Sequence, residues 1–182
     1  MTKGEKQNSE WLEEKWGSKT PHVGFVTHAR EFLGVVGLIK TSYKDVLDKH
    51  LFEDAYIFPG HYLLCHAVEL GLKSYLVQHG YTLDELRKKP LGHSLCNILA
   101  ETEKCGIDHS ILTLSLRSAI SFLNDLYVRK IFEYRGKPGI IRHDEWPCVK
   151  TMLRDMQKLL LLLENRYRED SRAEKRSPIT EC

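Results

Sequence analysis

The spacing of apolar residues constrains the fold of this chain most strongly, because these residues recur with the period of an α-helix almost throughout. In the segment "HYLLCHAVELGLKSYL", residues 61–76, apolar side chains recur on nearly every side of a helix with about 3.6 residues per turn. This pattern predicts a central helix that is buried on most sides. Since no segment alternates apolar and polar residues long enough to require a β-strand, we predict an all-α fold.

Local signals set the expected ends of the helices. Thr27 can cap one helix, and Pro59 fits the first turn of the next, which Gly80 would stop. The "RGKPG" segment at 135–139 should end the longest helix. The pattern predicts an up-and-down bundle of four to six helices with flexible termini, with helices at 28–48, 59–79, 82–89, 94–104, 108–134 and 145–164.

The two ends of the chain differ in composition from the middle. Residues 1–20 mix acids and bases, with Trp11 and Trp16 as aromatic anchors, and we expect a loosely held arm. The segment 165–182, "NRYREDSRAEKRSPITEC", is strongly charged, and we expect a disordered tail. The predicted helical domain therefore covers residues 21–164.

Composition limits the classes of partner and location. A net charge of +2 is too small to attract a polyanion through the overall field of the protein. Five scattered cysteines without a CxxC pair, and a start without a long apolar run, favour free thiols in the cytoplasm. The longest apolar run, "LLLLL", is far shorter than the roughly 20 residues of a membrane span. We expect a soluble, cytoplasmic protein without membrane contact.

Three polar residues in the predicted central helix form the first candidate site. His66, Glu69 and Lys73 fall within an arc of about 60°. Glu69 and Lys73 are placed to form an ion pair, and His66, one turn earlier, can hydrogen-bond to Glu69. His93 follows Gly92, where a tight turn would bring its ring against the same helix. We interpret these residues as polar contacts that fix the register of the helices; ligand binding and acid–base catalysis are the alternatives.

Two pairs of histidine and cysteine residues have the ligand types of a zinc site. His61 and Cys65 share one helical face, and His93 and Cys96 share another, so two nitrogens and two sulfurs would suit tetrahedral zinc. However, both pairs lie in helical segments without knuckle turns, and buried cysteines are ordinary core residues. We predict no metal and no cofactor.

The central helix and the segment after it resemble the HEPN superfamily of helical bundles. Members often show a helix of the form H-A-x-E-x-x-L-K-x-x-L followed by a G-H-x-L turn, and the similarity spans residues 58–138. The matching residues are His66, Ala67, Glu69, Leu72, Lys73 and Leu76, then Gly92, His93 and Leu95. The late segment "LNDLYVRKIFEYRGKP" is also similar to the last helix of such domains.

This resemblance implies a small helical bundle, often a homodimer. Many members are metal-independent ribonucleases, whereas others bind nucleotides or proteins. The ribonucleases carry Arg and His with about four to six residues between them, since Arg can hold the phosphate while His moves the 2′-hydroxyl proton. Here neither Arg129 nor Arg135 has a histidine at that spacing, and His143 lies one residue too far from Arg135.

The absent motif decides between the functions that the resemblance implies. We predict a non-enzymatic, homodimeric module that binds a nucleotide, RNA or another protein. The alternative is a toxin-like, metal-independent ribonuclease with a displaced site made of Arg129, Tyr134, Arg135 and His143, and a third is a structural subunit that binds only itself. A further interpretation of the same cations is that they compensate the dipole at the end of a helix.

The last predicted helix has two further interpretations. "MLRDMQKLLLLLENRY" has leucine on more than one face and can serve both the core and a dimer interface. Its basic residues are offset in the sequence by acidic ones, so we expect no basic face for nucleic acid. The basic residues are Arg166, Arg168, Arg172, Lys175 and Arg176, and the acidic ones are Glu164, Glu169, Asp170 and Glu174.

Overall fold

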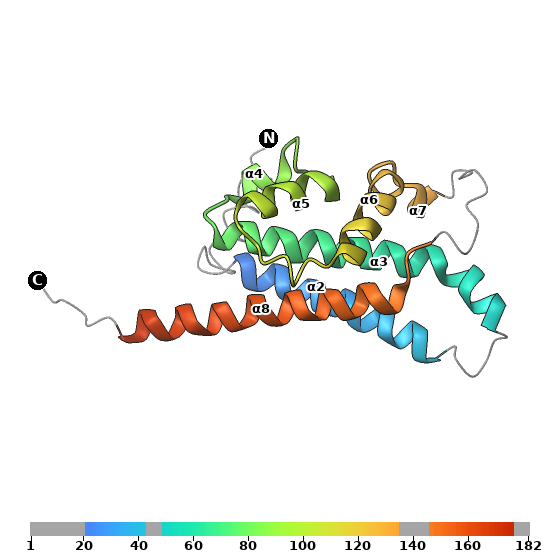
Figure 1. Ribbon diagram of the computed structural model, residues 1–182, viewed down its shortest axis with the longest axis horizontal. Coiled ribbons are helices and arrows are strands. Elements are labelled where there is room, and N and C mark those ends of the chain that lie inside the picture. The colour runs from blue at the N-terminus through green and yellow to red at the C-terminus, as the bar shows by residue number, and fades with distance from the viewer. Residues whose placement is uncertain (1–20, 43–48, 135–145, 177–182) are drawn as a thin grey trace, which may run out of the picture.

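The computed structural model describes residues 21–42, 49–134 and 146–176. These residues form seven helices and no strand, which confirms the predicted all-α class (Figure 1). The helices are α2 (Pro21–Ser42), α3 (Lys49–Gln78), α4 (Leu83–Arg87), α5 (Leu95–Lys104), α6 (Leu114–Val128), α7 (Ile131–Tyr134) and α8 (Val149–Arg176).

Helix α3 lies at the centre of the bundle, as its apolar pattern predicts. Helices α2 and α8 pack on one side of α3, and α5 and α6 pack on the other (Figure 1). Leu64, Val68, Leu72 and Leu76 of α3 are fully buried between these two layers. The position of α3 therefore brings its polar residues close to the helices on its α5–α6 side.

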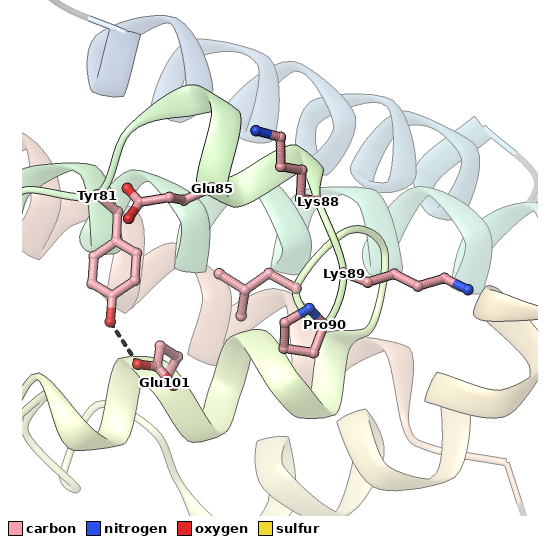
Figure 2. A pocket seen from close by; sticks show the side chains of 7 residues that line it. Tyr81, Glu85, Lys88, Lys89, Pro90 and Glu101 are labelled. Carbon is pink, nitrogen blue, oxygen red and sulfur yellow. Dashed lines mark hydrogen bonds between the residues drawn. The ribbon is translucent and has the colours of Figure 1, made fainter.

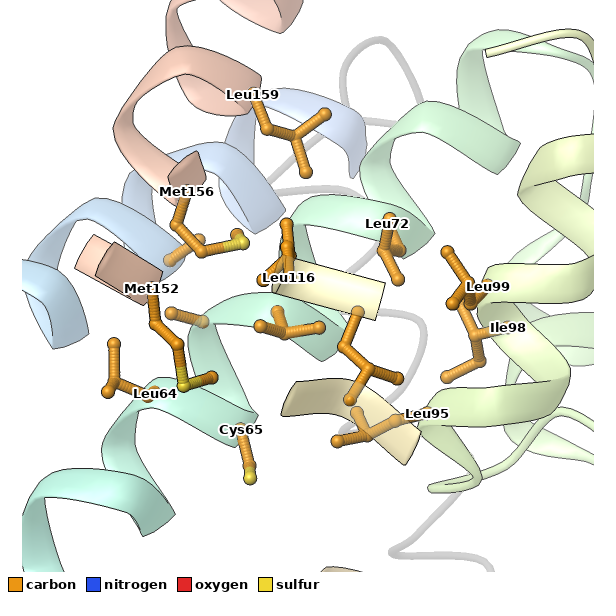
Figure 3. Close-up of a cluster of buried hydrophobic side chains, with 14 of the residues drawn as sticks. Leu64, Cys65, Leu72, Leu95, Ile98, Leu99, Leu116, Met152, Met156 and Leu159 are labelled. Carbon is orange, nitrogen blue, oxygen red and sulfur yellow. The ribbon is translucent and has the colours of Figure 1, made fainter. Parts of the chain in front are cut away.

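The core is built mainly from leucine side chains, with contributions from valine, isoleucine, alanine and two methionines. Figure 3 shows side chains of α3, α5, α6 and α8 meeting in one cluster. Complete burial of one such side chain stabilises a fold by about 1.5–3 kcal/mol. Gly71 permits the close packing of α3 on α8, since a Cβ there would lie 3.0 Å from Cε of Met156.

Two expected helix starts, near residues 82 and 94, are confirmed by the structure. The Thr82 side chain accepts a hydrogen bond from the backbone N–H of Glu85, and Glu85 accepts one from the backbone N–H of Thr82 in return. Ser94 caps α5 by accepting from the backbone N–H of Asn97. Both caps satisfy N–H groups that the helix itself leaves unpaired.

The predicted start of the central helix is wrong. Helix α3 begins at Lys49, so Pro59 lies inside it rather than in its first turn. A proline inside a helix costs about 3 kcal/mol, which tertiary packing can offset. Phe58 contributes to that packing, because its ring lies 5.5 Å from Trp146 and 6.0 Å from Phe132, measured between centroids.

Helix α2 also differs from its prediction. It runs from Pro21 to Ser42 instead of beginning at 28, and residues 43–48 lie outside the described residues. Its buried side consists of Val26, Ala29, Leu33 and Val36, whereas Val35 and Leu38 are exposed. Helix α2 therefore packs against α3 and α8 along one side and leaves apolar residues on the other.

The long helix expected at 108–134 is two helices. Helix α6 begins at Leu114, because Thr113 caps it by accepting from the backbone N–H of Leu116. It ends at Val128, and Lys130 then adopts a φ of +57°, which interrupts the helix before α7. Residues 135–145, which contain the predicted "RGKPG" break, lie outside the described residues.

Helix α8 extends beyond the expected end at 164. It begins at Val149 and continues to Arg176, so the expectation of disorder from residue 165 is wrong as far as Arg176. Contacts to the bundle explain the extension: the Tyr167 ring lies 5.2 Å from that of His22, and the Arg166 guanidinium lies over the Tyr75 ring. The arm at 1–20 and residues 177–182 lie outside the described residues.

Across the described ranges, no helix combines the length and the apolar character that a membrane span requires.

Candidate functional site

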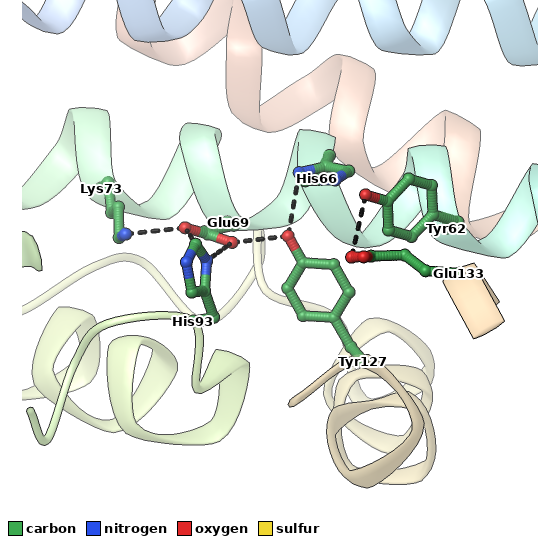
Figure 4. Close-up of polar contacts among 7 residues, drawn as sticks. All are labelled: Tyr62, His66, Glu69, Lys73, His93, Tyr127 and Glu133. Atoms are coloured by element: carbon green, nitrogen blue, oxygen red, sulfur yellow. Dashed lines mark hydrogen bonds and ion pairs between the residues drawn. The ribbon is translucent and has the colours of Figure 1, made fainter. Parts of the chain in front are cut away.

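A buried network of polar side chains is centred on Glu69 of α3 (Figure 4). The Glu69 side chain is only 5% exposed. Lys73 Nζ donates to Oε1 at 2.7 Å, and the Tyr127 hydroxyl donates to Oε2 at 2.6 Å. His93 Nδ1 lies 3.1 Å from each oxygen. Both carboxylate oxygens are therefore engaged by donors from the protein itself.

The chain brings these residues together from three segments. Glu69 and Lys73 lie one turn apart on α3, and their predicted ion pair is confirmed. His93 reaches Glu69 from the turn between α4 and α5, which confirms the predicted position of its ring. Gly92, with a φ of +39°, donates its backbone N–H to the carbonyl of Lys88 at 2.9 Å and shapes this turn.

His66 joins the network through Tyr127 of α6 rather than through a direct bond to Glu69. His66 Nδ1 lies 2.9 Å from the Tyr127 hydroxyl. Since that hydroxyl donates its single hydrogen to Glu69, it must accept from the Nδ1–H of His66. We therefore assign neutral His66 the tautomer that leaves Nε2 unprotonated.

Aromatic rings surround His66. Phe32 of α2 stacks on it at a centroid distance of 5.2 Å, and Tyr62 packs edge-on at 4.4 Å. Burial lowers the pKa of His66, although the nearby carboxylate of Glu69 opposes this. The imidazole is therefore neutral at neutral pH.

The acidic members of the network hold fixed protonation states. Burial raises the pKa of Glu69, but hydrogen bonds from Lys73, Tyr127 and His93 outweigh burial and leave the pKa below its usual value. Burial and the charge of Glu69 raise the pKa of Tyr127. Glu69 is thus an ionised carboxylate and Tyr127 a neutral phenol, and their hydrogen bond links α3 to α6.

Three members of this region were not predicted from the sequence. Tyr127 connects His66 to Glu69, and the Tyr62 hydroxyl donates to Glu133 Oε1 at 3.2 Å, which links α3 to α7 (Figure 4). A buried tyrosine usually finds a hydrogen-bond partner. This rule was the available signal for Tyr127, whose spacing from Leu116 and Leu123 in α6 is that of an ordinary core residue.

The predicted ribonuclease residues stand apart from this network in their described contacts. Arg129 caps the end of α6, and its exposed side chain donates to Asp125 Oδ2 at 3.2 Å. Tyr134 is the last residue of α7. Arg135 and His143 lie outside the described residues, so the cluster of these four residues stays a prediction.

The residues considered for zinc have other roles. His61 Nε2 lies 2.9 Å from the backbone carbonyl oxygen of Pro147, and the His61 ring packs 5.1 Å from Trp146. Burial raises the pKa of Cys65, which keeps it a thiol. Nowhere in the described part of the chain do three His, Cys, Asp or Glu side chains gather as metal ligands would.

A shallow pocket of about 330 Å³ lies between α4 and α5 (Figure 2). Its two carboxylates have partners within the protein: Tyr81 donates to Glu101 at 2.6 Å, and Glu85 belongs to the cap of α4. The lining combines two lysines with two glutamates and shows no clear preference for one ligand charge. The lining residues are Tyr81, Glu85, Lys88, Lys89, Pro90, Leu91 and Glu101.

Comparisons of this chain with protein-family models, with curated proteins and with solved structures found no match.

Proposed function

We propose that this protein is a non-enzymatic, HEPN-like helical module that binds a nucleotide, RNA or a protein partner. The engagement of Glu69 carries the proposal. Its two oxygens accept from Lys73, Tyr127 and His93, so the carboxylate is held by donors of the protein itself and is poorly placed to act as a general base. The order of the His66, Glu69, Lys73 and His93 motifs, which resembles the HEPN pattern, supports the same reading.

His93 is the member of the network that would meet a ligand. Its side chain is 73% exposed, whereas those of Glu69 and Lys73 are 5% and 8% exposed. Glu69 holds Nδ1, which orients the rest of the ring toward the surface. A ligand would therefore contact an imidazole whose direction is fixed before binding, which lowers the entropic cost of association.

Binding and cleavage can be tested on the same protein. We expect RNA incubated with it in EDTA to remain intact, and we expect calorimetry to detect binding of a nucleotide or RNA that His93→Ala weakens. His28→Ala is the matched control, since His28 is also an exposed histidine bonded to a glutamate, Glu31. Metal-independent cleavage that Arg135→Ala or His143→Ala abolishes would favour the ribonuclease alternative instead.

We also propose that the module is a homodimer that pairs through the outer face of α2. This face exposes Val35 and Leu38, the latter 66% exposed, and has open space at Gly34. A second copy of the same face would bury these residues. Sedimentation velocity should detect a dimer that Leu38→Glu dissociates. Leu114→Glu, at an 80% exposed leucine of α6, should leave it intact.

A further inference from the structure

The outer face of α8 carries a row of positively charged side chains. At about 100° per residue, these residues lie within an arc of about 80° on the helix. All are exposed. We call this row the α8 cationic stripe. It consists of five cations, Lys150, Arg154, Lys158, Arg168 and Arg172, together with the uncharged Leu161 and Asn165 on the same face.

Two acidic residues of α8 have partners on other segments of the chain. Glu164 forms an ion pair with Arg30 of α2, and Asp155 is buried, where it accepts from Thr113. Glu169 is exposed at the edge of the stripe. The carboxylates of Asp170 and Glu174 are outside the described side chains.

Most cations of the stripe have no acidic partner in the described part of the chain. Arg154 Nε donates to Asp155 at 3.1 Å, but no described carboxylate lies within ion-pair distance of the other four. Those four are Lys150, Lys158, Arg168 and Arg172. The face therefore presents a concentrated positive charge, although the whole chain has a net charge of only +2.

The stripe is long, and its support is rigid. From Lys150 to Arg172 the stripe spans 22 residue steps of α8, which is about 33 Å at about 1.5 Å per residue. The opposite side of α8, with Met152, Met156 and Leu159, is buried in the core. Figure 1 shows α8 as one straight helix along the edge of the bundle, with its C-terminal part extending past the other helices.

We infer that the α8 cationic stripe binds the phosphate backbone of a double-stranded nucleic acid. A duplex carries one phosphate charge per about 1.7 Å of its axis, so a length of about 33 Å presents roughly twenty charges, and a straight row of cations can contact those on the backbone segments that face it. The stripe contains no aromatic residue on which unpaired bases would stack, which disfavours a single strand. This inference goes beyond the proposed function, because the stripe lies on the α8 side of α3, whereas His93 lies on the α5–α6 side.

A membrane surface fits the stripe less well. An interfacial helix inserts its apolar face between lipids, but the apolar face of α8 is already buried against α2, α3 and α6. Leu161 is the one apolar residue of the stripe. Insertion would therefore require the bundle to open.

The test is the anisotropy of a labelled RNA duplex of about 20 base pairs, roughly twice the length of the stripe, titrated at several salt concentrations. The five cations predict a slope of about −4.5 for the logarithm of affinity against that of salt. Lys158→Gln/Arg168→Gln should weaken binding roughly tenfold or more and reduce the slope by about 2. Lys88→Gln/Lys89→Gln is the control: it removes the same charge next to α4, across α3 from α8 in Figure 1, and should change neither value.

Several results would overturn the inference. They are an absence of duplex binding at low salt, equal binding by the stripe variant and the wild type, and an equal loss in the control variant. Equally tight binding of a single strand, of phosphatidylserine vesicles or of polyglutamate would do the same. Binding that depends on His93 reports separately on the proposed function, and thermal unfolding of each variant checks that it is folded.

Discussion

The hydroxyl of Tyr127 on α6 donates a 2.6 Å hydrogen bond to Oε2 of Glu69 on α3. This bond connects two helices at a buried negative charge, and the same hydroxyl accepts from His66. Tyr127 therefore satisfies two groups that would otherwise be left without partners in the interior.

Tyr127→Phe should lower the free energy of unfolding by about 1–3 kcal/mol, because Glu69 loses a donor and His66 loses its acceptor. Urea denaturation measures this change. Tyr62→Phe is the matched control, since its hydroxyl bonds to the exposed Glu133, and we expect a loss below about 1 kcal/mol. Equal losses in the two variants would contradict the importance of the buried bond.

Lys73→Met should destabilise the protein by about 3–5 kcal/mol, because it leaves the buried carboxylate of Glu69 without its cation. Adding Glu69→Gln removes that carboxylate, so the double variant should lose less stability than the two single variants together. A double-mutant cycle by chemical denaturation measures the coupling. Strictly additive losses would show that the two charges do not interact.

Acidification should destabilise the fold in two steps. The pKa of folded His66 lies below its usual 6.5, mainly through burial, so the unfolded chain takes up a proton first and stability falls as the pH drops below that value. The pKa of folded Glu69 lies below its usual 4.5, because hydrogen bonds outweigh its burial, so stability falls again in that lower range.

Denaturation at a series of pH values should resolve the two steps. His66→Asn keeps a donor near the position of Nδ1 but does not titrate in this range. It should therefore weaken the first step and leave the second. An unchanged profile in this variant would assign the first step to other groups.

Lys130→Gly should stabilise the protein relative to Lys130→Ala by about 1 kcal/mol, because a side chain at a φ of +57° is strained and glycine is not. Both variants lose the exposed ion pair to Glu133, so their comparison isolates the backbone effect. Thermal denaturation measures the difference. Equal stability would indicate that the backbone leaves this conformation in solution.

Features that depend on neighbouring residues could be predicted from the sequence. The caps at Thr82 and Ser94 and the pair of Glu69 with Lys73 each depend on residues within one turn. The pattern of apolar residues also predicted the helical class and the central position of α3. Each of these follows from local geometry alone.

Features that depend on packing between distant segments could not be predicted. Helix α3 continues through Pro59, where Phe58 packs against Trp146, a residue far away in the sequence. Likewise, Tyr127 has the same spacing as a core residue, and only the approach of α6 to α3 shows the bond to Glu69. The partners of Glu164 and Asp155 on α8 were equally hidden in the sequence, because they come from α2 and from Thr113.

The packing of α8 against α2 and α3 sets the order in which the bundle forms during synthesis. Helices α2 and α3 follow each other in the chain and can associate as soon as both have left the ribosome. The side chains of Met152, Met156 and Leu159 arrive only when α8 is made. Until then, the nascent chain exposes the apolar surface that α8 later covers. At this stage that surface can bind chaperones or aggregate.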